Sequence, residues 1–186
     1  MSTLFVNNLN TASGTTITLP TGKTLVGTDE GAFRVPGTIL QVVQNVTANH
    51  ETISAGAWTA TSTQGTITPK SSTSKILVQI TGTIRAYNNG GSDARGAFRI
   101  YKSVGGGSYS QLGTHQITHR AYDYGGSGRL DDIPFHMQYL DSPSTTSATT
   151  YKIQMSVSSG TGAIGRRADA SSRGMGASLT AMEILG

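Results

Sequence analysis

The sequence predicts an all-β protein, built as an antiparallel β-sandwich or barrel. Glycine accounts for 24 of the 186 residues, and Ser and Thr dominate the polar positions. This composition favours turns and strands over helices. Several stretches alternate large apolar side chains with polar ones, as half-buried strands do. Glycine-rich turn signals separate these stretches at short intervals, which favours short antiparallel strands over helices.

The most regular alternation runs from Tyr151 to Val157, where every second side chain is large and apolar. In a pleated strand all of these side chains point to one face. Residues 133–139 follow the same rule and predict Tyr139 on the buried face with its apolar neighbours, while Pro134 suits a strand start or an edge strand. Residues 75–84 alternate in the same way. These apolar faces require a second sheet to pack against.

Three further segments complete the predicted sheets. Residues 98–102 and 109–119 are joined through GGGS and predict a hairpin, and residues 179–185 predict a final strand. A proline and a Ser/Thr cluster precede both the 75–84 strand and the 151–157 strand. We interpret this repeat as two similar strand entries in a sandwich of comparable halves, with Lys75 and Lys152 on the solvent side.

The first 35 residues differ in character from the rest. Pro20 and several glycines interrupt every short apolar run, so this segment cannot build a core of its own. We predict an N-terminal arm over residues 1–35, which attaches to a particle or forms a trimer stem, and a β-sandwich head over residues 36–186.

Composition narrows the class of protein. The chain has no cysteine, which rules out disulfides and thiolate metal sites. No apolar run approaches the roughly 20 residues of a membrane-spanning helix, and the first residues lack the basic start of a signal peptide. The net charge of +4 reflects few acids more than many bases, so it does not predict a nucleic-acid partner.

Four segments in order, VPGTILQVVQ (35–44), ITPKSSTSKILVQI (67–80), YLDSPSTTSATTYKIQM (139–155) and LTAMEI (179–184), resemble a family of bacteriophage virion proteins common in marine phages. Members are usually labelled tail fibre or structural protein. The stretch ITLPTGKTLVGTDEGA in the arm looks like the β-rich stems that precede heads in such fibres.

The resemblance implies a trimeric jelly-roll head, joined to the particle through its N-terminal arm. It implies a virion protein on the tail or capsid surface, made in the host cytoplasm, with itself and other virion proteins as partners. The function it favours is a tail-fibre or fibre-like appendage whose head binds host surface glycans. A capsid decoration protein and a carbohydrate-binding or hydrolytic module remain as alternatives. Because the surface loops of the family vary, no binding residue carries over.

Sites of chemistry are not evident. His115 and His119 would stand about 13 Å apart in a strand, too far to share one metal ion. Asp131 and Asp132 would point to opposite faces and are interpreted as solvated turn residues rather than a glycosidase pair with Asp123 or Asp141. We therefore predict no enzyme activity and no catalytic, cofactor-binding or metal-binding residue.

Candidate contacts with a ligand or a neighbouring subunit lie in two glycine-rich loops. They are Tyr122, Asp123, Tyr124 and Arg129 in the first loop, and Arg166, Arg167 and Arg173 in the second. Exposed tyrosines stack on sugars, and arginines pair with acidic groups, although a solubilising role for the arginines is the simpler interpretation. Trp58 is the only tryptophan. It is predicted to be a core or interface residue.

Overall fold

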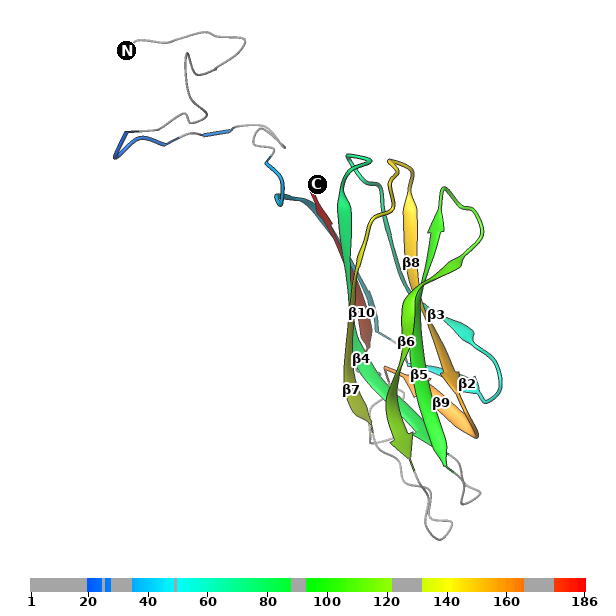
Figure 1. Cartoon of the computed structure of the whole chain (residues 1–186). Coiled ribbons are helices and arrows are strands. Elements are labelled where there is room, and N and C mark those ends of the chain that lie inside the picture. Colours follow the sequence, from blue (N-terminus) through cyan, green and yellow to red (C-terminus); the bar gives the residue numbers. More distant parts are fainter. Residues whose placement is uncertain are drawn as a thin grey trace. The chain divides into compact units, whose positions relative to one another are not determined.

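The computed structural model describes residues 20–24, 26–27, 35–48, 50–87, 93–121, 132–165 and 176–186, with the side chains of residues 115–121 left out. The chain divides into two compact units, residues 1–34 and 35–186. The described residues of the second unit form ten strands (Figure 1). They are β1 (Ile39–Thr47), β2 (Glu51–Ser54), β3 (Thr59–Ile67), β4 (Lys75–Tyr87), β5 (Ala94–Val104), β6 (Ser110–Ala121), β7 (Ile133–Asp141), β8 (Thr149–Val157), β9 (Thr161–Ile164) and β10 (Ala177–Ile184).

The strands pair as one long hairpin folded over on itself. β5 pairs with β6, β4 with β7, β3 with β8, β2 with β9 and β1 with β10, all antiparallel. Each pair is thus nested inside the next along the chain. Because the outer pairs join residues far apart in sequence, the sheets require many long-range contacts to form.

Three further pairings, β10 with β4, β4 with β9 and β5 with β8, join these pairs into two sheets. The first sheet has the order β1-β10-β4-β9-β2, with β7 on the other edge of β4, and the second has the order β3-β8-β5-β6. Without the short β2 and β9, each sheet has four strands, and the chain crosses repeatedly between them. Eight strands in two packed sheets with this nested pairing form a jelly roll. The prediction of an all-β, antiparallel, jelly-roll-like sandwich is confirmed.

The core lies between the two sheets and follows the alternation seen in the sequence. The side chains of β8 alternate between buried and half-buried along the whole strand, and Tyr151, Ile153 and Met155 have no exposed surface. Phe98 of β5 stacks on Phe135 of β7, with ring centroids 4.1 Å apart, and so joins the two sheets. Each large apolar side chain buried in this way contributes roughly 1.5–3 kcal/mol.

The prediction that Tyr139 is buried was wrong, since its side chain is 38% exposed. Within the described residues β7 pairs only with β4, so it is an edge strand, as Pro134 suggested. A side chain at an edge is covered on one side only. The ring instead lies against Gly113 of β6, where an added β-carbon would come within 2.6 Å of it. Tyr139 therefore closes the open side of the sandwich.

Candidate functional site

The sandwich has two ends of different character. The backbone N–H of Gly37 donates to Leu185 O (2.7 Å), so residue 35 enters beside the C-terminus. The opposite end carries the described residues that border the segments 88–92, 122–131 and 166–175, which are Tyr87, Asp93, Ala121, Asp132, Gly165 and Gly176 (Figure 1). The seven predicted contact residues, Tyr122, Asp123, Tyr124, Arg129, Arg166, Arg167 and Arg173, lie outside the described residues.

An ion pair stands next to this opposite end. The Arg85 guanidinium of β4 donates through Nε to Asp132 Oδ1 (2.8 Å) and through a terminal nitrogen to Asp132 Oδ2 (2.6 Å). The side chains are 0% and 7% exposed. The interpretation of Asp132 as a solvated turn residue was therefore wrong. It forms a forked pair with a buried arginine and fixes the start of β7.

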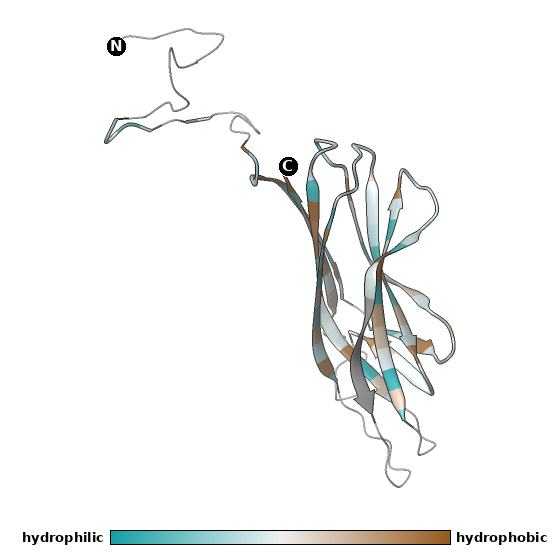
Figure 2. Ribbon diagram, viewed as in Figure 1, coloured by the Kyte–Doolittle hydropathy of each residue, from teal (hydrophilic) through white to brown (hydrophobic). Residues whose placement is uncertain are grey.

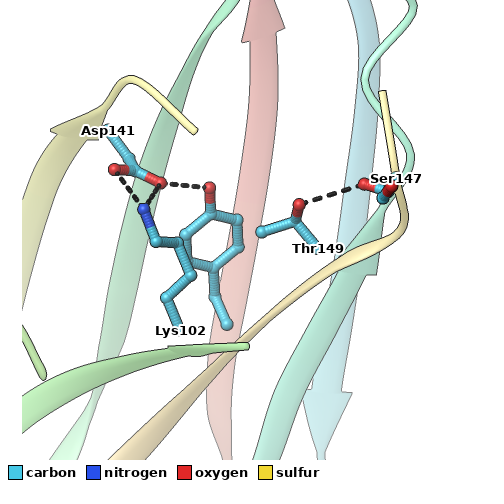
Figure 3. A network of polar contacts seen from close by, with 5 residues as sticks. Lys102, Asp141, Ser147 and Thr149 are labelled. Carbon is cyan, nitrogen blue, oxygen red and sulfur yellow. Dashed lines mark hydrogen bonds and ion pairs between the residues drawn. The ribbon is translucent and has the colours of Figure 1, made fainter. Parts of the chain in front are cut away.

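A second buried network lies toward the entry end. Lys102 Nζ contacts both carboxylate oxygens of Asp141, at 2.9 and 3.0 Å, and the Tyr151 hydroxyl donates to Asp141 Oδ2 at 2.7 Å (Figure 3). Burial, the hydrogen bond to Asp141 and the charge of Asp141 raise the pKa of Tyr151. The phenol therefore stays protonated as a donor, and the network ties β5 and β8 of the second sheet to β7 of the first.

Glu183 of β10 is a third buried polar group. Its carboxylate accepts hydrogen bonds from Gln41 Nε2 (2.6 Å) and from the backbone amides of Lys70 (2.7 Å) and Ser71 (3.3 Å). Burial opposes ionisation, yet these hydrogen bonds together lower the pKa of Glu183 below its usual value. Glu183 is thus an ionised carboxylate that holds the β3–β4 connection against the sheet.

These networks do not resemble a hydrolytic site. Asp132 directly precedes β7 and Asp141 ends it nine residues later, which places them roughly 30 Å from each other. Glycosidases need two carboxyl groups about 5–9.5 Å apart. Among the residues that the structure describes, no group of three or more His, Cys, Asp or Glu side chains is arranged to hold a metal ion. Nor does any helix in that part of the chain have the length and apolarity to cross a membrane.

The outer face of the first sheet carries an apolar row. Val42, Met182, Leu77 and Leu140 are direct neighbours across β1, β10, β4 and β7. The two outer members are well exposed, Val42 at 56% and Leu140 at 48%. The pair Ile39 and Ile184 continues this surface toward the entry end, where Figure 2 shows hydrophobic residues on β1 and β10. We call the four residues the apolar row.

The row next to it is polar but uncharged. Gln44, Thr180, Gln79 and Gln138 are neighbours across the same four strands. Gln44 Nε2 donates to Thr180 Oγ1 at 3.0 Å. Beyond it a hollow of about 440 Å³ is lined by uncharged residues of these strands, among them Val46, Thr81 and Pro134. The outer face of the first sheet thus offers contact area without charges around its centre.

The outer face of the second sheet has the opposite chemistry. The Arg99 guanidinium of β5 lies 4.2 Å from the ring of Trp58 and 4.5 Å from the ring of Tyr101. On the neighbouring β8, Lys152 Nζ lies 3.4 Å from the ring of Tyr109. We call these five residues the cation–aromatic cluster. The prediction that Lys152 faces solvent is consistent with its half-buried position on the outer face.

Hydrogen bonds fix the arginine of this cluster. Arg99 Nε donates to Gln154 Oε1 (2.9 Å), and a terminal nitrogen donates to Gln111 Oε1 (3.4 Å). Trp58 is therefore half-buried on a polar surface and is no part of the core. Sequence reasoning missed Arg99, Tyr101, Tyr109 and Lys152 as a group. Only the strand register, which pairs Arg99 with Gln154 and Tyr101 with Lys152, brings them together.

Comparisons with known proteins give a similarity in fold. Neither protein-family models nor curated proteins match the chain. Among solved structures, infectious bursal disease virus of the Gx strain is 15% identical, with a TM-score of 0.40, over 78% of this chain and 37% of that chain. The VP2 subviral particle of infectious bursal disease virus is 13% identical, with a TM-score of 0.37, over 88% of this chain and 42% of that chain. This chain spans less than half of those proteins, so its role has to be inferred from its own residues.

Proposed function

We propose that the protein is a structural component of a virus particle, a tail-fibre or fibre-like appendage whose jelly-roll head stands on an N-terminal arm. Jelly rolls serve in viral capsids and lectins, where the sheets form a rigid frame. The observation that carries the proposal is the difference between the two ends of the sandwich. The chain enters beside Leu185, while the described residues that border segments 88–92, 122–131 and 166–175 lie at the other end. Attachment at one end leaves the other end free to meet a host surface.

The second part of the proposal is self-assembly into a trimer through the first sheet. The apolar row exposes valine and leucine side chains at a level that favours burial against a second copy. The polar row beside it supplies hydrogen-bonding groups without the cost of burying charge; its members are Gln44, Thr180, Gln79 and Gln138. The same sheet face begins at Ile39, four residues after Val35, so copies that pack through it would bring their arms together. Its role is thus binding and assembly, without bond chemistry.

The mass of the full chain in solution tests this assembly. Light scattering on the chromatographed protein should give three times the chain mass of 19.4 kDa. Val42→Asp places a charge in the apolar row and should shift the protein toward monomer. Val104→Asp, at an exposed valine of the second sheet, is the matched control and should leave the mass unchanged. A monomeric parent chain, or equal effects of both substitutions, would contradict assembly through the first sheet.

The site on the particle is tested separately. A reconstruction of intact particles should show the chain in threefold groups on a fibre or tail. Deletion of residues 1–35 should remove the chain from particles and reduce adsorption to host cells. If the deletion left adsorption intact and instead lowered particle stability, the chain would be a capsid decoration protein and the appendage proposal would be wrong.

A further inference from the structure

The two cations of the cation–aromatic cluster are placed side by side. Arg99 pairs with Gln154 across β5 and β8, and Lys152 is two residues from Gln154 on the same face of β8. Such diagonal neighbours stand about 7–8 Å apart at their α-carbons. Like charges at this spacing repel each other, so placing Arg99 beside Lys152 does not stabilise the folded chain. A negatively charged group between them would relieve the repulsion.

The described part of the chain supplies no such group. Its acids Asp93, Asp132 and Asp141 pair with Arg95, Arg85 and Lys102, respectively. Glu51 accepts hydrogen bonds from Ser62, and Glu183 holds the β3–β4 connection. The partners found for Arg99 and Lys152 among the described residues are rings and amides. Two positive charges therefore stand at this surface without a carboxylate of the described chain.

The arginine is held in place before any ligand arrives. Its guanidinium lies against two rings, and two of its five N–H groups are used by the glutamines. The remaining three N–H groups keep the fixed fork geometry that matches a carboxylate. Because the side chain is already ordered, a ligand does not have to lose that freedom again on binding. The site is thus a preformed donor for a planar anion.

The residues around the cluster indicate which class of ligand bears that anionic group. The outer face around the cluster bears Gln64, Gln154, Thr66 and Thr150, which are amides and hydroxyls on adjacent strands. Side-chain amides donate and accept at once, which suits the hydroxyl groups of a sugar. Single-stranded nucleic acid would instead need free ring faces for successive bases and a longer run of cations. Here Arg99 and Lys152 already cover ring faces of the cluster.

We propose that the cation–aromatic cluster binds a carboxylated sugar of an acidic polysaccharide. Arg99 takes the carboxylate through its free N–H groups, Lys152 adds the second charge, and Gln154 and Gln64 contact neighbouring hydroxyls. This inference rests on the proposed appendage function in one respect only, namely that the polysaccharide belongs to a host surface. Binding is measured on the purified chain and does not depend on assembly, so the two proposals can fail separately.

The chain contains its own reporter for this test. Trp58 is the only tryptophan, and its ring lies 4.2 Å from the Arg99 guanidinium. Oligogalacturonate titrated into the purified full chain should change the tryptophan fluorescence along a saturable curve, and calorimetry should give the same affinity. Neutral dextran oligosaccharides of matched length and a thymidine oligonucleotide serve as the competing ligand classes. Neither should bind within tenfold of the oligogalacturonate affinity, since a charge-assisted hydrogen bond contributes about a factor of ten or more.

Three variants locate the binding. Arg99→Gln should weaken oligogalacturonate binding at least about tenfold, because the forked pair is lost. Lys152→Gln keeps that fork and should weaken binding about threefold to tenfold, and it covers the case that Arg99→Gln fails to fold. Lys75→Gln removes an equal charge from an exposed position of the first sheet and should stay within twofold of the parent. Thermal unfolding confirms that each variant is folded.

The proposal is overturned by any of three results. The first is absence of oligogalacturonate binding by the parent chain. The second is an equal effect of Lys75→Gln and Lys152→Gln, which would indicate net charge alone. The third is tighter binding of the thymidine oligonucleotide than of oligogalacturonate, which would assign the surface to nucleic acid.

Discussion

The buried network around Asp141 gives the sharpest prediction about stability. Asp141→Asn preserves the shape of the side chain but removes the charge that faces Lys102 and Tyr151. The Asp141 side chain is 6% exposed and that of Lys102 is 19% exposed, so water can replace little of the lost interaction. The asparagine oxygen can still accept hydrogen bonds, but the amide nitrogen replaces one carboxylate oxygen and presents N–H groups toward Lys102 or Tyr151, which are themselves donors. We therefore expect a large loss of stability.

The magnitude follows from the contacts. Removing one partner of a buried ion pair costs about 3–5 kcal/mol, and hydrogen bonds to charged groups contribute about 1.5–3 kcal/mol. Because Lys102 retains some contact with water, we expect Asp141→Asn to lower the free energy of unfolding by about 2–3 kcal/mol. Tyr151→Phe removes only the 2.7 Å hydrogen bond and should cost about 1.5 kcal/mol. Both losses are large against the roughly 5–15 kcal/mol that stabilises a domain.

Urea unfolding at neutral pH measures these differences. All variants should be compared at one protein concentration, because association stabilises the folded chain. Equal slopes with shifted midpoints would indicate that only stability has changed. The triple variant Lys102→Met, Asp141→Leu and Tyr151→Phe tests the cause, since an apolar set of similar size leaves no buried donor unpaired and should recover most of the loss. An Asp141→Asn chain within about 0.5 kcal/mol of the parent would show that the ion pair is not a significant source of stability.

Two further substitutions test the remaining buried contacts. Because the pKa of Glu183 is lowered in the folded chain, its stabilisation is present above the usual value of 4.5 and is lost as the pH falls through the folded value. Glu183→Gln should therefore lose about 1–3 kcal/mol at pH 7 and less at pH 3, as measured by urea unfolding at both pH values; an equal loss at both would contradict an ionised carboxylate. Gly96→Ala places a β-carbon against Ile84 across the core, and thermal unfolding should show a loss of about 1–3 kcal/mol. An unchanged melting temperature would mean that the two sheets are not so closely packed there.

The regular strands were predictable because their pattern is local. The alternation at residues 151–157 and 133–139 gave β8 and β7, and GGGS gave the β5–β6 hairpin. β3, with few large apolar side chains, was missed because Thr61 and Thr63 fill buried positions where an apolar residue was expected. Thr61 satisfies its hydroxyl by donating to Ile153 O of β8 at 3.1 Å. A hydroxyl that finds a backbone acceptor does not appear in a hydrophobic pattern.

The sites were less predictable because they depend on strand register. Asp132 was assigned to solvent because it follows a glycine-rich loop, but the structure places it beside Arg85, 47 residues earlier in the chain. Arg99 and Lys152 are 53 residues apart, counted along the sequence, and each alone is an ordinary polar residue on the outer face of a strand. The sequence pattern favoured ligand contacts in loops, where residues near in sequence are also near in space. Contacts across a sheet have no such local signal.

The proposals for the two sheet faces are compatible because the faces lie on opposite sides of the sandwich. If copies assemble through the outer face of the first sheet, which lacks charges around its centre, they bury the apolar row and leave the cation–aromatic cluster of the second sheet at the outside. The reverse arrangement would bury Arg99 and Lys152 without a carboxylate from the described residues, which costs several kcal/mol for each unpaired charge. Charge therefore decides which face can serve as an interface and which remains in water. An assembly of this kind would also present several copies of the cluster to one polysaccharide chain, so that weak binding at each cluster becomes strong attachment overall.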